Sequence, residues 1–328
     1  MQSRRPIIVA DSHIPFLKGL LEPFAEVRYL DPADITAETV REAEALIVRT
    51  RTICNAALLD GSKVQLIATA TIGYDHIDTA YCKQHRIAWT NAPGCNANSV
   101  VNYVASACEN LYDSLQGLCI GIIGAGQVGG RIAHWAREQG MQVLVNDPPR
   151  AAREGMEHFV SLDTLKHHAD IITVHTPLDA STYHLIDSRF LSECQPNALI
   201  INAARGPICD TDALLQASQT LVIDCWENEP EISQELLKKV KFGTPHIAGY
   251  SQDGKANGTR MAVEAVCRHF GWDAKTIIPL EPYHGERYDI RIDSDALKAN
   301  PGHFEQFRNQ YRVRRDFYRY DSPCSDIL

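Results

Sequence analysis

The sequence has no pair of cysteines at the C-x-x-C spacing that is typical of zinc and redox sites, although it contains ten cysteines in 328 residues. The cysteines are scattered singly, and no histidine accompanies one at metal-ligand spacing. This pattern argues against a structural metal site and against a disulfide framework. We therefore expect small, buried thiols that stay reduced, and no bound metal.

Membrane and export signals are missing as well. The apolar run over residues 118–123 is interrupted by glycine, far short of the length that spans a membrane. No apolar signal-peptide core with a cleavage site follows the strand-like residues 7–10 near the N-terminus. These absences predict a cytoplasmic protein without a membrane partner.

The sequence has fewer basic than acidic residues. The chain carries 32 lysines and arginines against 41 aspartates and glutamates, a formal net charge of -9 at pH 7. Such a surface repels phosphate backbones, which argues against a general nucleic-acid binder. A local basic pocket for a small anionic substrate stays compatible with this charge. The hydrophobic share of 45% is that of an ordinary globular protein, and the length suits two or three domains.

Short apolar runs alternate with amphipathic stretches in the N-terminal part of the chain. That alternation predicts parallel strands joined by right-handed helical crossovers. The predicted strands cover residues 7–10, 27–30, 45–48, 65–69 and 87–89, and the predicted helices cover 16–21, 55–59 and 77–85.

A second alternation follows a long predicted helix over residues 98–115. Two successive units of this kind predict two doubly wound parallel-sheet α/β domains, of the Rossmann or flavodoxin-like type, with a ligand cleft between them. The strands of the second unit are predicted at 117–123, 142–146, 170–173, 198–202, 221–224 and 244–247, and a further helix is predicted from 254 to 270.

The final stretch, from Pro279 on, differs in composition, because it is rich in arginine, tyrosine and aspartate and poor in aliphatic residues. It is either a small additional region or a tail that orders on contact with a partner chain. Aromatic residues that can anchor it to a core favour the small region. They are Phe304, Phe307, Tyr311, Phe317 and Tyr318.

A glycine-rich segment, Gly124-Ala125-Gly126-Gln127-Val128-Gly129, follows a predicted strand and opens a predicted helix over residues 128–138. In a dinucleotide-binding loop the three glycines provide a tight turn, room for the pyrophosphate and close helix–strand packing. The helix N-terminus offers free N–H groups to the phosphates. Asp147, after the next predicted strand, is well placed to accept the ribose hydroxyls, which favours NAD over NADP. The alternative is that Asp147 merely begins the Asp-Pro-Pro turn.

Three polar segments stand at the ends of predicted strands, where open α/β sheets bind their ligands. They contain Arg205, Glu229 and His246. Oxidation of a 2-hydroxy acid needs a guanidinium that binds the carboxylate, a base that takes the hydroxyl proton, and a carboxylate that holds the base. Singly, these residues are better explained as a surface charge, a turn cap and a structural histidine. Together, and downstream of a dinucleotide-binding loop, they predict a catalytic trio.

These motifs, together with the segment 71–78, resemble the D-isomer-specific 2-hydroxyacid dehydrogenase family over the part of the chain before residue 276. The resemblance implies a substrate (lid) domain at residues 1–94 and 252–278, an NAD-binding Rossmann domain at 95–251, and a short C-terminal dimerisation region at 279–328. It also implies that Arg205 binds and polarises the substrate, that Glu229 pairs with the histidine and that His246 exchanges the proton. The implied NAD contacts are Gly124, Gly126, Gln127, Val128, Gly129, Asp147, Thr176, Ala204, Asp224 and Gly249.

Further segments resemble one branch of this family, which acts on a phosphorylated four-carbon 2-hydroxy acid. They are residues 68–73, 93–104 and 246–251, and 301–307 followed by Arg314-Arg315. The resemblance implies a homodimer and substrate contacts at Thr50, Thr69 and Tyr250. Two alternatives stay open. One is a dehydrogenase of another 2-hydroxy acid, such as phosphoglycerate or hydroxypyruvate, and the other is a non-catalytic protein that senses NAD.

Overall fold

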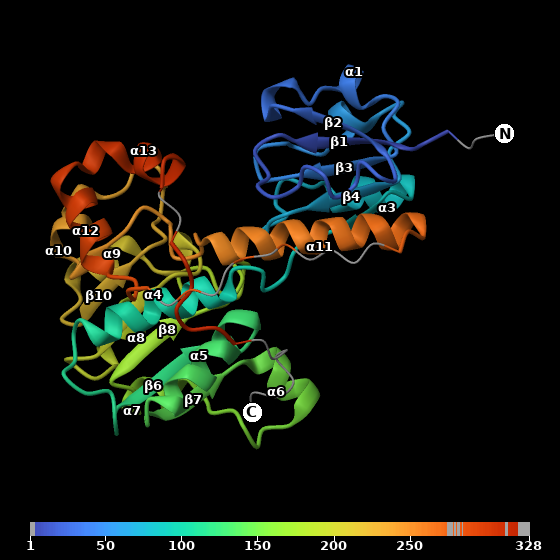
Figure 1. The fold of residues 1–328 in the computed structure, drawn as a ribbon. Coiled ribbons are helices and arrows are strands. Elements are labelled where there is room, and N and C mark those ends of the chain that lie inside the picture. Colours follow the sequence, from blue (N-terminus) through green and yellow to red (C-terminus); the bar gives the residue numbers. More distant parts are fainter. Residues whose placement is uncertain are drawn as a thin grey trace. The chain divides into compact units, whose positions relative to one another are not determined.

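The computed structural model describes residues 4–273, 278, 280, 283, 285–311 and 314–320. The chain forms two compact units, which Figure 1 shows coloured along the sequence. The first unit combines Met1–Asn96 with Ser251–Pro282, and the second combines Ala97–Tyr250 with Tyr283–Leu328. Each unit is therefore assembled from two separate stretches of the chain. None of the helices within the described residues combines the length and the apolar character that a membrane crossing requires.

The first unit is built on a five-stranded parallel sheet with the strand order β2-β1-β3-β4-β5, which confirms the predicted doubly wound α/β type. Strands β1, β3 and β4 are buried at every position, because helices cover both faces of a parallel sheet. The strands are β1 (Ile7–Asp11), β2 (Glu26–Leu30), β3 (Ala45–Val48), β4 (Leu66–Thr69) and β5 (Ala88–Thr90).

Helix α11 (Gln252–Phe270) packs on one face of this sheet, where Val263 and Val266 join the core formed with Ile8 and Ile47. In Figure 1 it is the long orange helix that accompanies the blue strands. A second core, which includes Val40, Leu58 and Cys82, lies on the opposite face. The shorter helices of this unit are η1 (Pro32–Asp34), α1 (Ala37–Val40), α2 (Ala56–Leu59) and α3 (Thr79–His85).

The predicted helix over residues 16–21 is wrong, because the chain makes successive turns there. Phe16 has a φ of +62° and Gly19 a φ of +91°, and both values lie outside the right-handed helical region. Leu17 and Leu21 are nevertheless buried in the core beside α11. Their spacing therefore reflects two core anchors on a turn rather than one face of a helix.

The second unit contains a six-stranded parallel sheet with the order β11-β10-β9-β8-β6-β7. The chain leaves β6 to one side to form β7 and then returns to the other side of β6 to form β8. This reversal creates a switch point between β6 and β8, where such sheets bind ligands. The strands are β6 (Cys119–Ile123), β7 (Gln142–Asn146), β8 (Ile171–Val174), β9 (Leu199–Asn202), β10 (Thr220–Ile223) and β11 (Phe242–Gly243).

Alternate residues of these strands enter two different cores. Ile122 and Val222 pack with Val104 of α4 and Trp135 of α5 in one core. The other core takes strand residues such as Ile200 together with α7, α8, α9 and α10. The helices are α4 (Ala97–Glu109), α5 (Gln127–Glu138), α6 (Pro148–Glu154), α7 (Leu162–His168), α8 (Ser188–Ser192), η2 (Gly206–Ile208), α9 (Thr211–Gln216) and α10 (Gln234–Lys239).

Two predicted elements of this unit differ from the structure, a helix that is shorter than predicted and a strand that does not form. Helix α4 stops at Glu109 instead of continuing to residue 115. The predicted strand over 244–247 is wrong, because the ladder pairs of β11 are confined to Phe242 and Gly243. The next residues turn toward the end of β10, where His246 takes a φ of +57° that no strand residue adopts.

The C-terminal segment belongs to the second unit and forms α12 (Ile290–Ala299), η3 (Pro301–His303) and α13 (Phe304–Asn309). Ile290 enters the core beside α4, whereas Leu297 and Phe304 enter the core on the other side of the sheet. Phe304 is 2% exposed, so this aromatic residue anchors α13. Nine cysteines of the described residues are buried free thiols, and Cys324 lies outside the described residues.

Candidate active site

The glycine-rich loop stands at the switch point of the second sheet. A Cβ on Gly124 would lie 2.7 Å from the carbonyl oxygen of His175, which follows β8, and a Cβ on Gly129 would lie 1.9 Å from the oxygen of Gly124. Both contacts are too short for any side chain. A Cβ on Gly126, at the N-cap of α5, would meet no atom within 4 Å. Two glycines are therefore needed for packing, and the middle one leaves open space at the helix N-terminus.

Asp147 follows β7 and holds the same loop. Its Oδ2 accepts a hydrogen bond from the N–H of Ala125 at 2.8 Å, and its Oδ1 accepts one from the N–H of Arg150 at 2.9 Å. The second bond caps α6. The turn-starting role considered for Asp147 is thus present, and the same carboxylate also ties the phosphate-binding loop to the end of β7.

Thr176 lies on the other side of the switch point. Its Oγ1 is buried, and no hydrogen-bond partner for it occurs among the described residues. Its methyl carbon would lie 3.0 Å from a Cβ on Gly124, so the Thr176 side chain stands beside the glycine-rich loop. A buried hydroxyl without a partner is unfavourable unless a ligand supplies one. The open space at Gly126 and this hydroxyl both fit a bound dinucleotide.

Glu229 and His246 form a direct pair. Nδ1 of His246 lies 2.7 Å from Oε2 of Glu229, and Oε1 of Glu229 accepts the N–H of Trp226 at 2.8 Å. Because Nδ1 faces the carboxylate, Nε2 is the ring nitrogen that can exchange a proton with a substrate. The Cys225 thiol belongs to the same cluster. Its Sγ, a carboxylate oxygen of Glu229 and a ring nitrogen of His246 all lie within 4.8 Å of one another.

Cys225 does not act as a nucleophile in this cluster. Burial, together with the carboxylates of Asp224 and Glu229, raises the pKa of its thiol well above the usual value. The thiol therefore stays protonated, and a protonated thiol is a poor nucleophile and a poor metal ligand.

Asp224, at the end of β10, organises the loop that carries His246. Its carboxylate accepts hydrogen bonds from the Thr244 hydroxyl at 2.6 Å and from the N–H groups of Ile247 and Ala248 at 2.8 and 2.9 Å. The side chain is only 1% exposed. Burial raises the pKa of Asp224, and the nearby His246 side chain and the three donors oppose that shift. The three bonds explain why residues 244–247 leave the sheet.

Arg314 holds the same loop through its carbonyl groups. Its guanidinium donates to the oxygen of Ala248 at 2.7 Å and to that of Ile247 at 3.1 Å, and it lies 4.0 Å from the centre of the Tyr288 ring. Residues 247–248 therefore bond through their N–H groups to a buried carboxylate and through their carbonyls to a guanidinium. Sequence reasoning missed this role, because Arg314 appeared only as part of a resemblance to a dimerisation region.

Arg205 lies at the end of β9, at the start of η2. The side-chain amide of Asn202 donates to the carbonyls of Arg205 at 3.0 Å and of Cys225 at 3.2 Å, which joins the two loops. A Cβ on Gly206 would lie 1.8 Å from the oxygen of Trp226, so these loops pack backbone to backbone. The guanidinium of Arg205 acts electrostatically on the Cys225 thiol, which places it near the Glu229–His246 pair.

The remaining predicted contacts fall in different parts of the chain. Ala204 is buried next to Arg205, and Gly249 lies in the turn before Tyr250. Thr50 and Thr69 belong to the first unit, after β3 and at the end of β4. Thr50 is exposed, whereas Thr69 is fully buried and its hydroxyl is 2.7 Å from that of Thr71.

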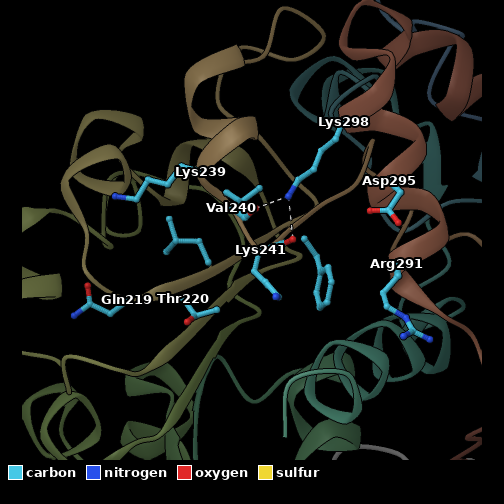
Figure 2. Close-up of a pocket in the computed structure, with 10 residues that line it drawn as sticks. Gln219, Thr220, Lys239, Val240, Lys241, Arg291, Asp295 and Lys298 are labelled. Atoms are coloured by element: carbon cyan, nitrogen blue, oxygen red, sulfur yellow. Dashed lines mark hydrogen bonds between the residues drawn. The ribbon is translucent and has the colours of Figure 1, made fainter.

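A depression of about 510 Å³ on the second unit does not contain these residues (Figure 2). It is lined by residues at the starts of β10 and β11 and by residues of α12, at the opposite end of these strands from Asp224 and His246. Two of its three lysines bond to backbone carbonyls: Lys298 donates to Val240 and Lys241, as the dashed lines show, and Lys239 donates to Leu215 and Ala217. We assign no ligand to it.

Replacing Arg314 tests its role in holding the loop. We expect Arg314→Met to lower the free energy of unfolding by about 1–3 kcal/mol, because the carbonyls of Ile247 and Ala248 each lose a charged donor in the protein interior. Chemical denaturation measures this loss. Arg291→Met is the matched control, since the Arg291 side chain is largely exposed and pairs with Asp289 beside it, and the change should cost much less. Equal losses in the two variants would contradict the assignment.

Comparison with known proteins places this geometry in a family. Residues 95–248 match the D-isomer specific 2-hydroxyacid dehydrogenase, NAD binding domain. The chain is 48% identical to an erythronate-4-phosphate dehydrogenase of Bacteroides fragilis, over 94% of this chain and 97% of that protein. It is 39% identical to an erythronate-4-phosphate dehydrogenase of Proteus mirabilis, over 97% and 95% of the two chains.

Solved structures agree with this result. D-lactate dehydrogenase of Aquifex aeolicus, complexed with NAD and lactic acid, is 26% identical with a TM-score of 0.65 over 81% of this chain and 96% of that chain. The NAD+-bound 3-phosphoglycerate dehydrogenase of Entamoeba histolytica is 25% identical with a TM-score of 0.69 over 81% and 95%. Because the sequence identity extends over nearly the full length of the curated relatives, the chain belongs to the D-isomer specific 2-hydroxyacid dehydrogenase family, in its erythronate-4-phosphate dehydrogenase group.

Proposed function

We propose that this protein oxidises 4-phospho-D-erythronate at C2 to (R)-3-hydroxy-2-oxo-4-phosphooxybutanoate with NAD, in the biosynthesis of pyridoxal 5′-phosphate (vitamin B6). The single observation that carries the choice of substrate is the near full-length similarity to erythronate-4-phosphate dehydrogenases. The 2.7 Å contact between Glu229 and His246, beside Arg205, supports the reaction class.

Three residues carry the proposed reaction. Arg205 binds the substrate carboxylate and polarises the carbon that is oxidised, because a guanidinium can bond both oxygens of a carboxylate. Neutral His246 takes the C2 hydroxyl proton at Nε2 as the hydride leaves C2, and in the reverse direction its imidazolium returns that proton. Glu229 orients the ring through Nδ1 and stabilises the imidazolium. NAD, when bound, supplies the hydride acceptor.

The residues proposed to hold NAD lie around the switch point. Gly124, Gly126 and Gly129, with Gln127 and Val128, receive the pyrophosphate at the N-terminus of α5. The other proposed contacts are Asp147 for the ribose hydroxyls, Asp224 for the nicotinamide carboxamide, and Thr176, Ala204 and Gly249. The open space at Gly126 and the unpartnered Thr176 hydroxyl support this assignment.

The proposal extends to the organisation of the chain. Residues 1–94 and 252–278 act as the substrate domain, 95–251 as the NAD-binding domain, and 279–328 as a dimerisation region of a homodimer. Thr50, Thr69 and Tyr250 contact a phosphorylated 2-hydroxy acid. A cytoplasmic location is supported by the free thiols of the described cysteines, which a reducing compartment preserves.

Two glycine variants separate cofactor binding from folding. Gly126→Ala should leave the thermal unfolding temperature nearly unchanged, because its methyl group enters open space in the protein. The same methyl should occupy room needed by the pyrophosphate and weaken NAD binding by at least about tenfold. Gly129→Ala should lower both stability and NAD affinity, because its Cβ would overlap the oxygen of Gly124. Thermal melts and NAD titration calorimetry measure the two effects, and unchanged NAD binding in Gly126→Ala would contradict this site.

A substrate panel tests the proposed reaction. We expect NADH formation with 4-phospho-D-erythronate at a higher kcat/KM than with unphosphorylated erythronate or 3-phosphoglycerate. In the reverse direction, (R)-3-hydroxy-2-oxo-4-phosphooxybutanoate should be reduced at a higher kcat/KM than hydroxypyruvate. His246→Ala should reduce turnover by about 10²–10⁴-fold while NAD affinity is kept. Preference for another acid would replace the substrate, and tight NAD binding without turnover of any acid would favour a sensor.

A further inference from the structure

The C-terminal segment brings a cation to the proton-transfer pair. Nη1 of Arg308, on α13, lies 3.8 Å from Oε2 of Glu229, the same oxygen that contacts Nδ1 of His246. The Arg308 guanidinium also hydrogen-bonds to the side chain of Tyr250 and lies 3.6 Å from Oε1 of Glu305. Burial alone would lower the pKa of Arg308, but the interactions with Tyr250, Glu229 and Glu305 raise that pKa above its usual value.

The position of this cation is well supported by packing. Phe304, one turn before Arg308 on α13, is 2% exposed and belongs to a hydrophobic core of the second unit. Tyr311, just after α13, packs edge-on against Tyr250 with ring centres 6.1 Å apart. Tyr250 is therefore contacted twice by the C-terminal segment of its own chain.

Several charged or titratable groups lie on or around the loop that carries His246, within the second unit. The carboxylates favour the imidazolium form, whereas the guanidinium groups oppose it. The groups are Glu229 at Nδ1, Asp224 and the protonated Cys225 behind the loop, Tyr250 after it, and the guanidinium groups of Arg205, Arg308 and Arg314. Arg308 is the cation of this set with a contact to the Glu229 carboxylate among the described residues.

We propose that Arg308 is a positioning residue of the proton-transfer site, which holds Glu229 and Tyr250 in place and offsets part of the carboxylate charge that His246 experiences. The inference rests on the proposed role of His246 as the base. Without Arg308, the Glu229 carboxylate favours the imidazolium more strongly. Neutral His246, the form that accepts the hydroxyl proton, then becomes available only at higher pH.

The pH profile of kcat/KM for oxidation tests this inference. We expect the acidic limb of Arg308→Gln to move to higher pH by about half a unit or more, because a unit charge near the pair is removed. Arg308→Lys keeps the charge and should restore the wild-type limb. Arg291→Gln makes the same change of net charge at a largely exposed arginine that pairs with Asp289, so it should leave the profile unchanged.

Two outcomes overturn the inference. A profile of Arg308→Gln that is lower at every pH but has its acidic limb unmoved indicates a structural role only. An equal displacement in Arg291→Gln indicates a general effect of net charge. The NMR titration of the His246 ring in the protein without cofactor gives the same test without any substrate. A displaced NMR titration in Arg308→Gln with no turnover of 4-phospho-D-erythronate by the wild type would retain this inference and reject the proposed substrate.

Discussion

The capture of the His246 loop by the Asp224 carboxylate is the interaction on which the rest of the site depends. A strand that continued past β11 would present residues 244–248 along the sheet. Instead, three donors from Thr244, Ile247 and Ala248 converge on one buried carboxylate. The backbone of His246 is thereby fixed in a left-handed conformation, which costs of order 1–3 kcal/mol and needs such support.

Arg314 adds an indirect contribution to the stability of the buried Asp224 carboxylate. Arg314 does not bond to it but donates to the carbonyls of the same two peptide groups whose N–H groups face Asp224. The peptide groups of residues 247–248 thus lie between the Asp224 carboxylate and the Arg314 guanidinium. Both charges polarise these groups, in an interior where electrostatic interactions are strong. The His246 ring, held at one end by this backbone and at Nδ1 by Glu229, has little freedom left, and a fixed base is what proton transfer requires.

Local patterns predicted much of this architecture. The strands at 45–48 and 142–146 have the predicted bounds, because each is a short apolar run between turn residues. The glycine-rich loop was also recognised from sequence, because its glycines have the spacing of a dinucleotide-binding loop. The ends of β9 and β10 were recognised because polar residues follow apolar runs there. The helix expected over 16–21 failed, because two buried leucines on a turn imitate helical periodicity.

Long-range contacts were beyond sequence reasoning. Arg314 bonds to carbonyls 66 and 67 residues away, and Arg308 reaches Glu229 from a segment whose composition suggested only an additional region. Backbone carbonyls carry no residue type, so no pattern marks them as partners. The strand expected over 244–247 failed for a similar reason. The side chain of Asp224, twenty residues before Thr244, binds this segment and draws it away from the sheet. The C-terminal segment is therefore part of the site in its own chain, besides its proposed role in dimerisation.

The tautomer of His246 tests the central claim most directly. Most exposed histidines carry their neutral-form proton on Nε2, whereas the contact of Nδ1 with Glu229 requires the proton on Nδ1. In ¹⁵N NMR spectra of the labelled protein, recorded at a pH where the ring is neutral and assigned with His246→Gln, the account predicts a protonated Nδ1 and an unprotonated Nε2. A protonated Nε2 with a bare Nδ1 would contradict it, because the base would then face the substrate with its proton already in place.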